Sequence, residues 1–324
     1  MRKFAHFNAR SIEEAVSILR RYGGHAHLIA GGTDIVGKMK DHILPVYPEA
    51  LVNLKTIPNM DAIREEGGTL KVGAMALLED IARHAVVMEK FTALAEAAGR
   101  CASPHLREMG TVGGNICQDI RCWYYRHPDN RFACLRKRGS RCYALEGDNR
   151  YHSIFGGSVE EGCVAVHPSD TAPALIALDA SIRTTKRTVK AENFFQVGVT
   201  KTTVLEYDEM VTEIQIPAPP KGARSAFLKF ALRKSIDFPI VNCAVLVSSS
   251  KGRVERARIC LNAVYVTPYR ATKAEEVMIG KVLNETNAEA AGSAATEGAK
   301  PLKDNRYMVQ IAKALVKRAI LSCN

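Results

Sequence analysis

Cysteines concentrate in one segment of the chain, where they could bind a metal ion or a cluster. Six of the nine cysteines lie between residues 101 and 163, and Cys122, Cys134, Cys142 and Cys163 are separated by 11, 7 and 20 residues. Thiolates bind zinc or iron when several converge on one ion or cluster. Seven basic residues and one acidic residue lie from Arg121 to Cys142. Positive charge of this kind lowers thiol pKa values and offsets the charge of a thiolate-bound cluster.

The cysteine spacing by itself leaves several interpretations open. The segment has no C-x-x-C pair, so it matches neither a ferredoxin pattern nor a zinc ribbon. The thiols could be small buried apolar groups, disulfide partners, zinc ligands or cluster ligands. An odd number of cysteines in a cytoplasmic chain disfavours disulfides.

Two glycine-rich turns could bind a phosphate group. A predicted strand over residues 27–30 runs into Gly31-Gly32-Thr33-Asp34 and then into a predicted helix over residues 35–40. Glycine allows close approach of the backbone, and free amides after a strand favour an anion such as a pyrophosphate. The pattern is not the G-x-G-x-x-G of a Rossmann fold, and an ordinary glycine turn is the alternative. The second turn, residues 110–115, leads directly into the cysteines.

The predicted elements that position these residues form two blocks. A helix capped by Ser11 with Glu14 at its third position opens the first block. After a predicted strand over 163–166, Ser169 or Asp170 would cap a helix that includes Ala174 to Leu178, so Asp170 could be only a helix N-cap. The proline-rich stretch 217–222 predicts a boundary between the blocks. Further strands are predicted at 51–54, 63–73 as a hairpin, 180–185, 211–216, 224–232, 239–249 and 254–264, and further helices at 78–84, 90–99, 272–282, 286–299 and around Met308 to Ala319.

Length and composition limit the class of protein. At 324 residues and 47% hydrophobic content, the chain predicts two or three globular domains without a membrane span. The first residues lack the apolar stretch of a signal peptide, so we expect the cytoplasm, with export alongside a partner subunit left open. The net charge is +11, but the stretch from Arg121 to Cys142 supplies seven minus one, or +6. Nucleic-acid binding is therefore not expected.

Together, the two glycine turns, the cysteine segment and the late change to strands and helices resemble the FAD-binding subunit of molybdenum hydroxylases, the xanthine dehydrogenase family. The resemblance covers nearly the whole chain. It implies an α+β fold, with a two-part FAD-binding domain of the PCMH (vanillyl-alcohol oxidase-like) type at residues 1–220, divided into 1–55 and 56–220. A C-terminal domain like that of CO dehydrogenase flavoproteins, with an antiparallel sheet and helices, would follow at 223–324.

The resemblance also implies which residues would bind FAD. Asp170 would hold the flavin or the ribose by hydrogen bonds, and Lys229 would favour the anionic reduced flavin through its charge, although no residue receives a certain catalytic role. The implied FAD-binding residues are Ile29, Ala30, Gly31, Gly32, Thr33, Asp34, Thr111, Gly113, Gly114, Asn115, Asp170 and Lys229.

Residues 117–163, here called the cysteine loop, resemble an insertion found in one branch of the family. That branch carries an extra 4Fe-4S cluster and includes the 4-hydroxybenzoyl-CoA reductase β subunit and the aromatic aldehyde oxidoreductase flavoprotein subunit. The positions that match the cluster ligands are Cys122, Cys134, Cys142 and Cys163, with Cys117 as a rival. The first and last intervals between these cysteines differ from those of the reductase.

The implied function is electron transfer within a heteromeric molybdenum-containing oxidoreductase. The chain would hold FAD and a 4Fe-4S cluster and pass electrons between 2Fe-2S clusters of a small partner subunit and an external carrier such as NAD or ferredoxin. A large partner subunit would carry the molybdenum cofactor and determine the substrate. Two alternatives are a stand-alone flavoprotein oxidase and a non-redox scaffold stabilised by zinc.

Overall fold

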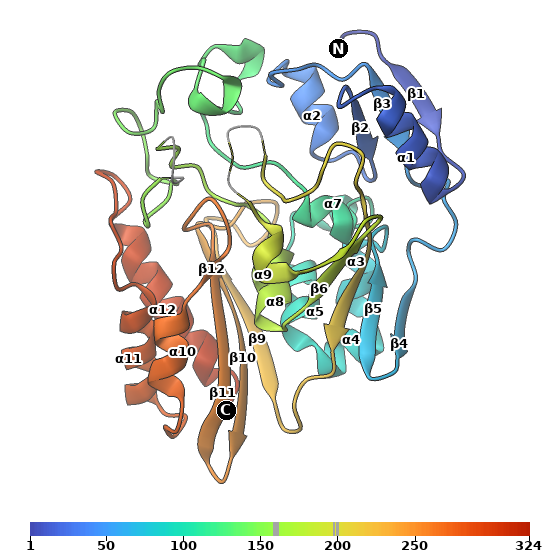
Figure 1. The fold of residues 1–324 in the computed structure, drawn as a ribbon. Coiled ribbons are helices and arrows are strands. Elements are labelled where there is room, and N and C mark those ends of the chain that lie inside the picture. Colours follow the sequence, from blue (N-terminus) through green and yellow to red (C-terminus); the bar gives the residue numbers. More distant parts are fainter. Residues whose placement is uncertain (158–161, 197, 199–200) are drawn as a thin grey trace.

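The computed structural model describes residues 1–157, 162–196, 198 and 201–324. Three β-sheets follow one another along the described chain, from blue through cyan and yellow to orange in Figure 1. No helix in these ranges has the length and apolar character needed to cross a membrane.

The first sheet is parallel, with the strand order β1-β3-β2. The Ser11 hydroxyl caps the first helix by accepting a hydrogen bond from the Glu14 amide at 3.2 Å. The Glu14 carboxylate accepts from the Arg10 amide instead of the Ser11 amide, so the predicted capping box forms only in part. The elements are β1 (Ala5–Asn8), α1 (Ile12–Arg21), β2 (Ala26–Ile29), α2 (Ile35–Lys40) and β3 (Ala50–Asn53).

The second sheet has the order β4-β5-β8-β6-β7, and its paired strands are antiparallel. The predicted hairpin at 63–73 is confirmed, and Gly67 and Gly68 adopt the positive φ values that its two-residue turn requires. The elements of this block are β4 (Ile63–Glu66), β5 (Thr69–Gly73), α3 (Leu78–Arg83), α4 (Ala85–Lys90), α5 (Thr92–Gly99), α6 (Pro104–Arg107), α7 (Val112–Ile116), α8 (Thr171–Ala177), β6 (Ser181–Thr184), β7 (Thr188–Lys190), α9 (Ala191–Phe194) and β8 (Val211–Pro217).

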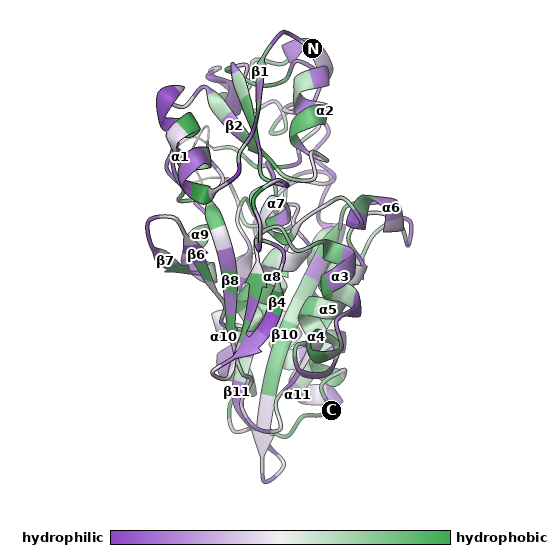
Figure 2. Ribbon diagram, turned by 90° about the vertical axis from the view of Figure 1, so that its right-hand side faces the viewer, coloured by the Kyte–Doolittle hydropathy of each residue, from purple (hydrophilic) through white to green (hydrophobic). Residues whose placement is uncertain are grey.

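The third sheet is antiparallel, with the order β12-β11-β10-β9. Helices α10 and α12 pack on one face, and α5 and α8 of the preceding block pack on the other (Figure 1). Strand β10 is therefore buried over residues 241–248, and Figure 2 shows it hydrophobic until its end near the hairpin. The elements are β9 (Arg224–Phe230), β10 (Val241–Ser250), β11 (Arg253–Asn262), β12 (Tyr269–Arg270), α10 (Thr272–Met278), α11 (Glu285–Ala295) and α12 (Tyr307–Leu321).

The cysteine loop contains little regular structure. Two short turns of 3-10 helix, η1 (Pro128–Asn130) and η2 (Leu135–Lys137), lie within it, while residues 158–161 of the loop lie outside the described residues. The predicted strand at 163–166 is wrong, because only Val166 forms a β-bridge, with Arg121. An apolar run predicts burial correctly here, but no neighbouring segment runs alongside it for more than one residue.

Candidate functional site

The first glycine turn presents a row of unpaired backbone amides. Strand β2 ends at Ile29 and α2 begins at Ile35. Across the described chain, the amides of residues 31–35 have no hydrogen-bond acceptor. Gly32 adopts a φ of +75°, the left-handed conformation that glycine favours. Successive free amides next to such a residue form a concave surface that suits an anion.

Gly31 is the point where the two glycine turns meet. A Cβ atom added to Gly31 would lie 2.7 Å from the carbonyl carbon of Met109 and still closer to its oxygen. No larger side chain fits without moving backbone. The glycine therefore allows the turns to pack against each other, a reason that the sequence alone did not reveal.

The second glycine turn is built differently, because its amides are already used. It is the first turn of α7, and the Thr111 hydroxyl caps it by accepting from the Gly114 amide at 3.1 Å. The Gly113 amide donates to the Ala74 carbonyl at 2.9 Å, and a Cβ on Gly113 would lie 2.7 Å from that oxygen. The amide of Asn115 donates to Thr111 within the helix. Gly113 thus seats α7 against the end of β5.

The two turns line adjoining cavities of about 260 and 210 Å³. The larger one, here called the flavin cavity, is bordered by residues 31–35 on one side and by Thr111, Gly114 and Asn115 on the other. Asp170 lies at its wall. Together the cavities are long and polar at the turns, a shape and lining that suit a dinucleotide.

Asp170 and Lys229 form a buried ion pair beside this cavity. Lys229 Nζ donates to Asp170 Oδ2 at 2.7 Å, and Asn242 Nδ2 donates to Asp170 Oδ1 at 2.7 Å. Burial raises the pKa of Asp170, and Lys229 and Asn242 oppose that shift. Both side chains are more than 90% buried, and Asp170 lines the cavity. The structure therefore brings together the two residues that the resemblance placed near the flavin.

Ser169, and not Asp170, caps helix α8 with its side chain. The Ser169 hydroxyl accepts from the Ala172 amide at 3.0 Å and donates to Asn115 Oδ1 at 2.5 Å. Asp170 makes no capping hydrogen bond. Of the two predicted capping residues, Ser169 supplies the capping oxygen, and the Asp170 carboxylate binds Lys229 instead.

Several residues of this region were not predicted from the sequence. Cys101 lines the flavin cavity with a buried thiol whose pKa burial raises, and Asn115 Nδ2 lies 3.8 Å from its sulfur. Ile236 and Phe238 form part of the cavity wall, on the segment between β9 and β10. These two apolar side chains are 51% and 44% exposed. The sequence gives no signal for this exposure, because it depends on how the segment lies in the folded chain.

The four predicted metal ligands lie close together in the cysteine loop. Cys134 and Cys163 share one buried apolar cluster, and Cys122 packs against it. A hydrogen bond from the Cys163 thiol is the main cause that lowers the pKa of Cys142 to about 6. The charge of Cys142 in turn contributes to the raised pKa values of Cys122 and Cys134. Cys117, the rival ligand, lies at the end of α7 and lines the 210 Å³ cavity.

The basic residues affect these thiols less than the sequence suggested. Burial is the main cause that raises the pKa of Cys122 to about 12, so the expected lowering by positive charge is wrong for this thiol. Lys137 Nζ lies beside the thiols and is buried without a hydrogen-bond partner among the described residues. Its charge acts on Cys134. Within the described ranges, no three His, Cys, Asp or Glu side chains are close enough to hold a single metal ion.

Some of the cations join the cysteine loop to the first glycine turn. Arg126 donates to Asp34 Oδ1 at 2.8 Å, and the Asp119 amide donates to Asp34 Oδ2 at 3.0 Å. Lys38 lies 3.3 Å from Asp119 Oδ2. The Asp34 side chain is therefore occupied by protein partners, and only its amide faces a ligand.

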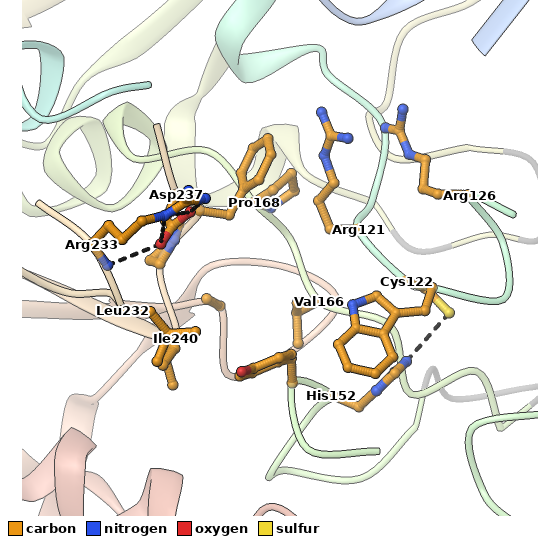
Figure 3. Close-up of a pocket in the computed structure, with 15 residues that line it drawn as sticks. Arg121, Cys122, Arg126, His152, Val166, Pro168, Leu232, Arg233, Asp237 and Ile240 are labelled. Atoms are coloured by element: carbon orange, nitrogen blue, oxygen red, sulfur yellow. Dashed lines mark hydrogen bonds and ion pairs between the residues drawn. The ribbon is translucent and has the colours of Figure 1, made fainter. Parts of the chain in front are cut away.

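A third cavity, of about 600 Å³, lies between the flavin cavity and the cysteines, and is here called the Cys122 cavity (Figure 3). It shares Arg121, Pro168 and Phe238 with the flavin cavity. Cys122 Sγ lies 3.3 Å from His152 Nε2 at its far side, and burial lowers the pKa of that imidazole to about 4. The cavity therefore extends from the wall of the flavin cavity to the first of the four thiols.

The fold and the cavities define an α+β protein that binds a dinucleotide at glycine turns brought together from separate sheets. The chain belongs to the FAD-binding family of the molybdopterin dehydrogenases. The family described as "FAD binding domain in molybdopterin dehydrogenase" matches residues 2–219, and "CO dehydrogenase flavoprotein C-terminal domain" matches residues 226–323. The α+β fold and the oxidoreductase class predicted from the sequence are confirmed.

Known proteins resemble the chain over nearly its full length. The carbon monoxide dehydrogenase medium chain of Hydrogenophaga pseudoflava is 31% identical, covering 98% of this chain and 96% of its own. The aldehyde oxidoreductase FAD-binding subunit PaoB of Escherichia coli K12 is 30% identical, and the match covers 97% of this chain and 96% of PaoB. Among solved structures, carbon monoxide dehydrogenase from H. pseudoflava, which lacks the Mo-pyranopterin moiety of the molybdenum cofactor, superposes with a TM-score of 0.78 at 29% identity. The superposition covers 98% of this chain and 96% of the matched chain.

Proposed function

We propose that this chain is the FAD-binding electron-transfer subunit of a heteromeric molybdenum-containing oxidoreductase and that it also carries a 4Fe-4S cluster. The cluster ligands would be Cys122, Cys134, Cys142 and Cys163. The observation that carries the proposal is the shared wall between the flavin cavity and the Cys122 cavity. Two redox groups held on either side of this wall could exchange electrons within one chain.

The flavin part of the proposal is supported by the fit of the cavity to FAD. The free amides of residues 31–35 would hold the pyrophosphate, while the second turn would border it through Thr111, Gly114 and Asn115. The Asp170–Lys229 pair would face the isoalloxazine. FAD supplies the two-electron and one-electron redox chemistry, and these residues bind and orient it.

The cluster part is supported by the surroundings of the thiols. Cys134 and Cys163 lie in an apolar pocket with Ile120, Tyr125 and Val266, which would exclude water. The buried, unpaired Lys137 ammonium lacks an anionic partner that a thiolate-bound cluster would supply. A single zinc ion needs its sulfur ligands within about 2.3 Å. A cluster separates its ligands more widely, so the lack of a single-ion site among the described residues does not bear against a cluster.

The partners follow from the relatives, which are named as medium chains or subunits. We infer a large subunit with the molybdenum cofactor and a small subunit with 2Fe-2S clusters. The domain limits 1–220 and 223–324, with the cysteine loop inserted in the first, are part of the same proposal. The external carrier, NAD, ferredoxin or another, would exchange electrons with the FAD or the cluster.

The test compares Cys134→Ser with Cys117→Ser in protein purified without oxygen. We expect about four irons per chain in the wild type, loss of that iron in Cys134→Ser with FAD retained, and full iron in Cys117→Ser. Full iron in the Cys134 variant would contradict the ligand assignment. Zinc in place of iron would contradict the cluster, and protein without flavin would contradict the electron-transfer function as a whole.

A further inference from the structure

Arg121 occupies a position unlike that of the other basic residues of the cysteine loop. It immediately precedes Cys122 and lines both the flavin cavity and the Cys122 cavity. Its guanidinium lies over the Phe238 ring, 4.1 Å from the ring centroid. In Figure 3, the Arg121 and Arg126 side chains extend in the same direction, while Cys122 turns away toward His152. Arg121 is thus held at the flavin cavity mainly by an aromatic face.

The ion pairs of the region leave Arg121 without a strong partner. Its closest carboxylate atom is Asp34 Oδ1, at 3.4 Å, and Arg126 binds the same oxygen at 2.8 Å. Arg121 Nε is buried and has no hydrogen-bond partner among the described residues. Two carboxylates, Asp34 and Asp119, serve all the cations of this cluster. Those cations are Lys38, Arg121, Arg126 and Arg136.

We propose that Arg121 binds the phosphates of FAD, so that the cysteine loop contributes a residue to flavin binding. The inference rests on the proposed function, because it requires FAD in the flavin cavity. Arg121 lies beside Asp34, at the end of the turn whose free amides border the same cavity. A guanidinium presents a planar array of donors that matches phosphate oxygens, and this pairing is strong where water is limited. A phosphate oxygen would also supply the acceptor that Arg121 Nε lacks among the described residues.

The proposal makes flavin retention depend on the loop that holds the cysteines. Phe238 and Asp34, which are far apart in the sequence, both contact the guanidinium of Arg121 and hold it beside the flavin cavity. Arg121 therefore needs no large movement to meet a phosphate in that cavity. A change in the loop that shifts residue 121 should weaken FAD binding without touching the glycine turns.

The experiment measures binding of three ligands to the flavin-free full chain by titration. FAD and ADP carry a diphosphate, whereas riboflavin carries no phosphate. The variants are Arg121→Met, Arg121→Lys and, as a matched control, Arg131→Met. Arg131 is an exposed arginine of the same loop that also lies over an aromatic ring, that of Phe132.

We expect Arg121→Met to bind FAD and ADP about tenfold or more weakly, the loss of one charge-assisted contact. Riboflavin affinity should not change, Arg121→Lys should recover part of the loss, and Arg131→Met should match the wild type. Added salt should weaken FAD binding to the wild type more than to Arg121→Met, a comparison that holds even if the variant is less stable. Equal weakening for riboflavin, or unchanged FAD affinity, would overturn the role of Arg121. Absence of FAD binding to the wild type would instead overturn the proposed function.

Discussion

The contact between the two glycine turns can be tested by replacing Gly31 with alanine. The added Cβ would press into the Met109 carbonyl group, which is backbone and cannot rotate away like a side chain. The turns must therefore separate. The unpaired amides of residues 31–35 begin at Gly31. Separation of the two turns therefore also changes the surface that would hold the pyrophosphate.

The expected magnitude follows from the geometry of the contact. Adding one methyl group to a tightly packed site costs about 1–3 kcal/mol. In a chain of this size, each kcal/mol lowers the thermal midpoint by about 2 °C. We therefore expect Gly31→Ala to unfold at a clearly lower temperature in its flavin-free form. We also expect it to bind FAD about tenfold more weakly, measured by the change in flavin fluorescence on titration.

Gly37→Ala is the matched control, since Gly37 lies in the adjoining helix α2 and a Cβ there would meet no atom within 4 Å. Alanine inside a helix is more stable than glycine by about 0.5–1 kcal/mol, so this variant should keep or raise the thermal midpoint. If Gly31→Ala behaved like Gly37→Ala in both the thermal midpoint and FAD affinity, the packing of the two turns through Gly31 would be refuted.

Three further changes test other parts of the site. Ser169→Ala removes the acceptor of the Ala172 amide and the donor to Asn115, so the free energy of unfolding should fall by about 1 kcal/mol in a denaturant titration. An unchanged value would contradict the cap. Burial opposes ionisation of Asp119, but the surrounding cations keep its pKa well below the usual value. The ionised carboxylate therefore stabilises the fold above about pH 4, and this contribution is lost as the pH falls through the folded-state pKa. Asp119→Asn should accordingly lose less stability than the wild type when the pH is lowered from 5 to 2.5. Lys137→Gln removes the unpaired cation beside the thiols, so a spectroscopic redox titration should show a cluster potential lower by about 40 mV for each kcal/mol of attraction lost. A potential equal to that of the wild type would argue against this charge effect.

The sequence predicted the regular elements well where local signals were strong. The first helix begins after Ser11, and helix α2 has the predicted limits, because a capping hydroxyl and flanking glycines mark their ends. The predicted helix at 90–99 is found as α5, which begins at Thr92 because the buried Phe91 lacks helical geometry, and the preceding helix α4 was not predicted. That choice depends on packing between distant segments, which a local pattern does not contain.

The candidate site was predicted in its residue types but not in how those residues are used. Both turns are rich in glycine, yet only the first keeps its amides free among the described residues, since Thr111 and Ala74 accept hydrogen bonds from the amides of the second. Asp34 shows the same limit, because its side chain binds Arg126 and the Asp119 amide. Which partner a polar group finds depends on residues more than 80 positions away.

These ion pairs explain how a long irregular loop can be held in one conformation. A segment without helices or sheets loses much conformational entropy when it is ordered, and few backbone hydrogen bonds offset that loss. Arg126 and Asp119 attach the start of the loop to the Asp34 turn, and Cys122 lies between these two attachment points. The turn that offers amides to the flavin therefore also anchors the cysteines. For this reason, a change at Asp34 should affect both cofactors at once, whereas a change at Cys134 should affect only one.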